Sequence, residues 1–116
     1  MSLDVYLEMK IDTGGAVPYR LVLFEGNITH NLRDMAAEVG IYDHIWHPKD
    51  VGISTASELI EPLGSALGAL ATNADHLIAH FSPENDWGTY QGFFRFVSTY
   101  LQACISHPKA NVVADA

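Results

Sequence analysis

Three short stretches hold most of the side chains that could bind a ligand. They are residues 26–31, 42–48 and 85–91, and each combines amide, hydroxyl, imidazole or indole groups. The first and third stretches stand where the sequence predicts the start of a helix, whose free N–H groups and dipole favour an anion. Two such helix ends meeting beside a tryptophan would form a pocket for a flat, polar ligand such as a nucleotide. The candidate pocket residues are Asn27, Thr29, His30, Asn31, Trp46, Trp87 and Tyr90.

Ordinary structural roles also account for many of these residues. Asn27, Thr29 and Asn31 are suited to capping a helix or bonding turn backbone. Trp87 and Tyr90 are suited to a core position or to a hydrophobic contact at a helix start. His30 has no obvious capping role, so it provides the test of the pocket. A nucleotide ligand should stabilise the protein thermally, and His30→Ala should reduce that effect at unchanged fold.

Six histidines raise the question of a metal site. His44 and His47 are three residues apart and His76 and His80 are four apart, so each pair would share one helix face. A zinc site needs three or four converging ligands, and these pairs come from separate segments. Motifs for a metalloprotease, a calcium loop, a serine nucleophile or a phosphate loop do not occur. The sequence therefore predicts no cofactor, and a metal-dependent enzyme is the least favoured of three function classes.

The charge of the chain excludes two classes of partner. Six Lys and Arg against fourteen Asp and Glu give 116 residues a net charge of −8. So few cations cannot form the basic patch that nucleic acids or anionic membranes require. The carboxylates are dispersed and form no charged run, which indicates an acidic exterior. The second function class is an acidic protein-interaction or inhibitor module, in which Phe96 would be an exposed anchor for a host protein or for a homodimer.

Hydrophobic periodicity predicts the elements that position these residues. Residues 3–11 alternate apolar and polar side chains, which indicates a strand with one wet face. Residues 12–15 are turn-forming, and residues 19–24 form a second strand whose consecutive apolar residues predict greater burial than in the first. Residues 110–114 are a short final strand.

Helices are predicted between the hairpin and the final strand. They cover residues 32–39, ended by Gly40, and residues 59–70, where Pro62 would remove one backbone bond unless it falls in the first turn. Residues 75–81 form a further short helix or a continuation of the preceding one, and residues 90–105 form a helix with an aromatic stripe. The fold class is α+β, an N-terminal antiparallel hairpin plus a short C-terminal strand covered by three to four helices. The length predicts one domain, residues 1–116.

Cysteine usage and hydropathy predict a cytoplasmic protein. Cys104 is the single cysteine, so an internal disulfide cannot form, and a buried, inert thiol is expected. The N-terminus lacks the basic and apolar segments of a signal peptide, and apolar runs fall short of the ~20 residues of a membrane span.

Several motifs resemble a group of small uncharacterised proteins from phages and bacteria. They are residues 27–32 (Asn-Ile-Thr-His-Asn-Leu), 40–48, 59–63 and 85–90 (Asn-Asp-Trp-Gly-Thr-Tyr). The resemblance covers most of the chain and implies a phage or mobile-element context in a host cytoplasm, without implying an activity. In those relatives Arg often precedes the proline after Trp46, and the positions of His76 and His80 are ordinary. The preferred function is therefore a non-catalytic module that binds a small polar or anionic, nucleotide-like molecule.

Overall fold

The computed structural model describes residues 1–83 and 87–116. Its sheet consists of the antiparallel strands β1 (Ser2–Ile11), β2 (Tyr19–Thr29) and β3 (Asn111–Asp115), in the order β2-β1-β3. The α-helices are α1 (Arg33–Glu38), α2 (Tyr42–Trp46), α3 (Ile60–Thr72), α4 (Ala74–Phe81) and α5 (Tyr90–Ser106). Short 3₁₀ turns cover His30–Leu32, Pro48–Val51 and Ala56–Leu59. The predicted α+β fold, with its N-terminal hairpin and short C-terminal strand, is confirmed.

The central strand of the sheet is β1, which buries one face against the helices. Leu3, Val5 and Leu7 have no exposed surface, as expected where alternate residues point to the same side of a strand. Val112 of β3 lies opposite Leu7 and is also buried. The other face of β1 carries polar and charged residues, so the helices cover one side of the sheet.

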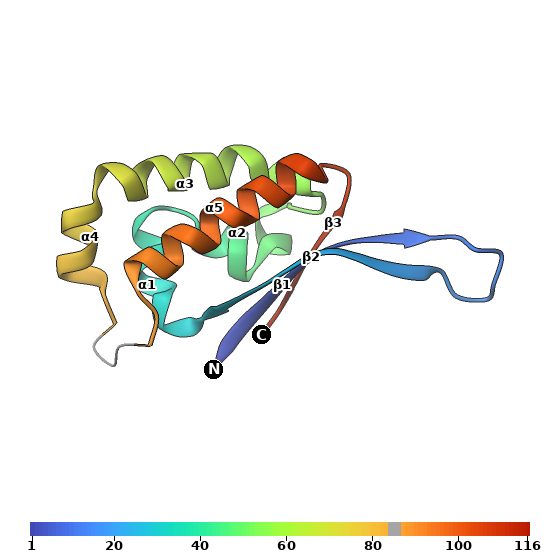
Figure 1. Ribbon diagram of the computed structural model, residues 1–116, viewed down its shortest axis with the longest axis horizontal. Helices are drawn as coiled ribbons and strands as arrows, with labels where there is room; N and C mark the ends of the chain where they lie inside the picture. Colours follow the sequence, from blue (N-terminus) through green and yellow to red (C-terminus); the bar gives the residue numbers. More distant parts are fainter. Residues whose placement is uncertain (84–86) are drawn as a thin grey trace.

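The expectation that the second strand would be the more buried of the two is wrong. β2 is an edge strand, and its first half projects beyond the helices (Figure 1). Leu23 is an extra residue between the pairs Leu7–Phe24 and Glu8–Val22, so part of the apolar run forms a β-bulge. β2 also continues past the predicted end at Phe24 as far as Thr29. Its second half buries Ile28 and stays paired with β1.

The helices gather around one end of the sheet (Figure 1). α3 packs on α5, and α5 also contacts β2. α5 begins where the sequence predicts, because the Thr89 hydroxyl accepts a hydrogen bond from the backbone N–H of Gly92 at 2.9 Å. Its buried face belongs to one cluster with β1 and α3. The buried residues of α5 are Phe93, Val97, Tyr100 and Cys104.

The core contains two ionisable side chains, Cys104 and Tyr100. Cys104 is fully buried, as predicted, and burial raises the pKa of its thiol to about 12, which keeps it protonated and unreactive at neutral pH. Burial also raises the pKa of Tyr100 far above its ordinary value. The Tyr100 ring stacks on Phe24 at 5.5 Å between centroids, which ties α5 to β2. Both groups therefore serve packing.

The start of the α3 region depends on one carboxylate. Glu58 Oε1 accepts hydrogen bonds from the backbone N–H groups of Thr55 at 2.9 Å and Ser54 at 3.1 Å, and from the Ser54 hydroxyl at 3.0 Å. These backbone bonds, first Thr55 and then Ser54, lower the pKa of Glu58 from 4.5 to about 2. Because the folded state binds the proton more weakly than the unfolded state, the bonds stabilise the fold above pH 4.5.

We expect that stabilisation to disappear as the pH falls from about 4.5 to about 2. Glu58→Gln should be less stable than the wild type at neutral pH and should lose less stability over that acidic interval. Urea unfolding followed by circular dichroism at several pH values measures both effects. Glu61→Gln removes a carboxylate nearby and controls for net charge. Equal acid sensitivity of Glu58→Gln and the wild type would contradict this assignment.

In the described ranges, no helix has both the length and the apolar character needed to cross a membrane.

Candidate ligand-binding site

The first two polar stretches are joined by a hydrogen bond. The indole Nε1 of Trp46 donates to Nδ1 of His30 at 2.8 Å. Trp46 is only 5 % exposed, and Tyr42 stacks on it with 5.2 Å between ring centroids. Since Nδ1 accepts this bond, it carries no proton, and a neutral His30 holds its proton on Nε2. His30 thus fixes a core tryptophan beside the end of β2.

The first and third stretches also meet. The Asn31 side-chain amide donates to the Trp87 carbonyl oxygen at 3.4 Å, and the Thr29 hydroxyl accepts from the Asn31 backbone N–H at 3.3 Å. Gly88 lies so close that a Cβ added to it would be 2.7 Å from Thr29 Cγ2. The three stretches therefore converge around Thr29–Asn31. Asn85 and Asp86 of the third stretch lie outside the described residues.

The seven candidate residues nevertheless do not line one common cavity. Asn27 lies on the face of the sheet opposite the helices, where its amide donates to Asp4 Oδ1 at 2.7 Å. Tyr90 donates its hydroxyl to the Leu70 carbonyl at 2.6 Å. Trp46 is in the core, whereas Trp87 is 67 % exposed. Of the predicted set, Asn31 borders the largest of the cavities described, while its amide is engaged with the Trp87 carbonyl.

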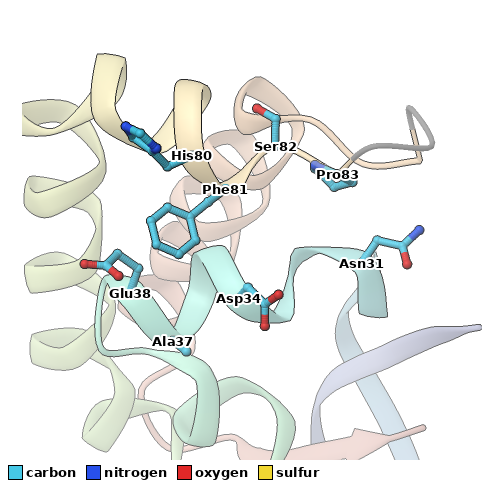
Figure 2. A pocket seen from close by; sticks show the side chains of 8 residues that line it. All are labelled: Asn31, Asp34, Ala37, Glu38, His80, Phe81, Ser82 and Pro83. Carbon is cyan, nitrogen blue, oxygen red and sulfur yellow. The ribbon is translucent and has the colours of Figure 1, made fainter.

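That cavity lies between α1 and α4 and has a volume of about 630 Å³. Figure 2 shows Phe81 of α4 pointing toward α1, with Glu38 at one end and Asn31 at the other. Its volume is within the range of small-molecule sites. The lining residues are Asn31, Asp34, Ala37, Glu38, His80, Phe81, Ser82 and Pro83.

The lining of this α1/α4 cavity is negatively charged. Asp34 and Glu38 are one helical turn apart on α1, so their carboxylates share one face. Among the described residues that border the cavity, none is Lys or Arg. Phe81 adds an aromatic ring, and rings attract cations over their faces. The cavity can accept hydrogen bonds from an ammonium or guanidinium group, whereas a phosphate would be repelled.

Sequence reasoning missed most of this cavity. Asp34 and Glu38 are four residues apart on a helix whose Met35 is buried. This spacing could have predicted two carboxylates on the exposed face of that helix. Phe81 and Ser82 carried no such signal, because they become lining residues only when α4 lies against α1. The Ser82 hydroxyl is itself engaged, since it donates to the Ile78 carbonyl at 2.6 Å.

The four histidines considered as metal ligands lie apart in two pairs. His76 and His80 are neighbours on α4, with 4.8 Å between ring centroids. His47 Nε2 is 3.3 Å from the Tyr42 hydroxyl, and His44 lies on α2 with a partly buried side chain. In residues 1–83 and 87–116, no group of three or more His, Cys, Asp or Glu side chains is placed to hold a metal ion.

Comparisons with protein-family models, with curated protein sequences and with solved structures give no match to this chain. The resemblance to small phage and bacterial proteins stays a prediction.

Proposed function

We propose that this protein is a non-catalytic binding module for a small polar ligand, which it holds in the α1/α4 cavity. The observation that supports this proposal is the cavity itself, which has about 630 Å³ of space and is bordered by Asn31 of the first polar stretch. A binding role is favoured over catalysis because two groups that could act as nucleophiles have structural roles. The Cys104 thiol is buried in the core, and the Ser82 hydroxyl is bonded to backbone.

The charge of the lining favours a ligand with a positive or neutral polar group. Asp34 and Glu38 can each accept a charge-assisted hydrogen bond from one ammonium or guanidinium group. Phe81 would cover the apolar part of the ligand between the two helices (Figure 2). A nucleotide phosphate would face both carboxylates, so a nucleotide-like ligand suits this cavity only through its uncharged base or sugar.

The test is a thermal-shift panel followed by calorimetric titration. The panel contains putrescine, agmatine, adenosine and adenosine monophosphate, which separate the cationic, neutral and anionic classes. We expect the two cations to stabilise the protein, because a ligand that binds only the folded state raises its stability. Asp34→Asn and Glu38→Gln should each weaken the binding about two- to fivefold, as expected for one partly solvated charge pair.

Glu61→Gln on α3 is the matched control, because it changes the net charge equally without bordering the cavity. Its affinity should equal that of the wild type. Binding of adenosine monophosphate in preference to the cations, unchanged by Asp34→Asn, would contradict the cavity assignment. No thermal shift with any of the four compounds would contradict the proposed ligand class.

A further inference from the structure

The half of the hairpin beyond the bulge leaves an apolar face uncovered. This hairpin arm, residues 8–22, projects away from the helices (Figure 1). Met9 and Ile11 continue the alternation of β1, so they share the face that buries Leu7 nearer the helices. Met9 pairs with Leu21 and Ile11 pairs with Tyr19. Tyr19 is 59 % exposed. The apolar face that the helices cover at Leu7 therefore continues along the hairpin arm, where its side chains are exposed to solvent.

The size of the molecule agrees with an unpaired arm. The accessible surface is 6739 Å², against about 6,200 Å² for a compact chain of this mass. The radius of gyration is 14.9 Å, against about 13.4 Å for a compact domain of this length. Both excesses are those expected of a chain with a projecting, unpacked arm.

The local charge permits a second copy to approach at this place. The chain carries −8, but the arm contains Glu8, Lys10, Asp12 and Arg20, whose charges cancel. The arm is therefore a neutral region on an acidic molecule, where self-repulsion is weakest. An acidic chain that self-associates is expected to do so through such a region.

The outer edge of β2 adds a complementary charge pattern. β2 is the edge strand on this side of the sheet, and the bulge places Arg20 and Glu25 on the same face. Within its own chain the Arg20 guanidinium forms an ion pair with Glu8 and lies over the Tyr6 ring, so a Glu25 of a second copy would be an additional partner for it. Two β2 strands can pair antiparallel around a two-fold axis, an arrangement in which each contact occurs twice. With Arg20 opposite Glu25 of the second copy, each charge meets its opposite.

The same register fits the shapes of the apolar residues. A groove of about 240 Å³ runs between β2 and α5, and Phe24, Gly26, Gly92 and Phe96 are among its lining residues. In the register set by Arg20, the Tyr19 of one copy lies opposite Gly26 of the other, at this groove. The Phe24 ring of the same chain already covers Gly26, since a Cβ added there would lie 3.2 Å from Phe24 Cζ, so the incoming Tyr19 ring would pack against Phe24 at the edge of the groove. The paired residues are Tyr19 with Gly26, Arg20 with Glu25, and Leu21 with Phe24.

We propose that two copies of this chain form a symmetric dimer by antiparallel pairing of β2 with β2, which joins their sheets edge to edge. The hairpin arm of each copy lies along the β2–α5 groove of the other and places Tyr19 in it. This inference is independent of the α1/α4 cavity, which lies between other helices.

Sedimentation velocity tests the dimer and its register. The wild type should sediment as a dimer of about 25 kDa, twice the 12.7 kDa chain. Arg20→Glu and Glu25→Arg should each weaken the dimer at least tenfold, because each places like charges opposite one another twice. An equimolar mixture of these two variants should recover a heterodimer, since both junctions then pair Glu with Arg.

Two further variants separate the interface from general effects. Tyr19→Lys should weaken the dimer at least as strongly as the charge reversals, and its exposed position leaves the fold intact by circular dichroism. Lys109→Glu changes the net charge as much as Arg20→Glu but lies in the turn before β3, so it should leave the dimer unchanged. A wild type that stays monomeric up to about 1 mM, as it would if a foreign protein occupied the edge, overturns the proposal. A dimer indifferent to Arg20→Glu and Tyr19→Lys overturns it as well.

Discussion

Replacing Gly88 with alanine is expected to destabilise the fold by about 2–4 kcal/mol. The backbone of Gly88 has a φ of +94°, which L-residues rarely adopt. An added Cβ would also lie 2.7 Å from Thr29 Cγ2 and 3.0 Å from Leu32 Cγ. These contacts belong to the junction between the end of β2 and the start of α5. Urea unfolding followed by circular dichroism measures the loss.

Gly40→Ala is the matched control for this substitution. Gly40 has a φ of +78°, but nothing lies within 4 Å of its added Cβ. It should therefore destabilise by about 1 kcal/mol, from backbone strain alone. The difference between the two variants reports how tightly residues 87–89 pack on Thr29 and Leu32. Equal losses for Gly88→Ala and Gly40→Ala would show that the two segments are not in contact.

Much of the fold could be predicted because its signals are local. The alternation in residues 3–11 identified β1, the aromatic stripe of residues 90–105 identified α5, and Gly40 identified a helix end. The order of the strands could not be predicted, because it depends on which strand pairs with residues from the far end of the chain. The bulge at Leu23 could not be predicted either, because an extra residue in a run of apolar residues gives the same pattern as a longer buried strand.

The site could be predicted only in part. The polar stretches do converge, and the clue was that two of them stand at helix starts. Composition cannot distinguish a tryptophan that faces a ligand from one whose indole N–H is satisfied inside the core, and Trp46 is of the second kind. The carboxylates of the cavity were visible on α1, but their importance depends on Phe81 of α4 lying across them. Because that contact joins two helices that are far apart in the sequence, no local sequence pattern predicts it.

The hydrogen bond between Trp46 and His30 should have a measurable effect on stability. His30→Ala leaves a nearly buried indole N–H without its acceptor, so we expect a loss of about 1–3 kcal/mol. Trp46→Phe removes the donor and part of the packed ring, for an expected loss of about 2–4 kcal/mol. The expectation from sequence that His30→Ala would leave the fold unchanged is therefore revised, and the substitution is unsuited to a binding test.

A double-mutant cycle separates the bond from the packing around it. If the bond links the two side chains, His30→Ala and Trp46→Phe together should lose about 0.5–3 kcal/mol less than the sum of their separate losses. His30→Asn is the conservative control, because its amide oxygen can accept a hydrogen bond near the position of Nδ1, and it should retain most of the wild-type stability. Strict additivity, or a His30→Asn variant as unstable as His30→Ala, would mean that His30 acts through its volume. The end of β2 would then be positioned by packing on Trp46, and an acceptor at residue 30 would be dispensable.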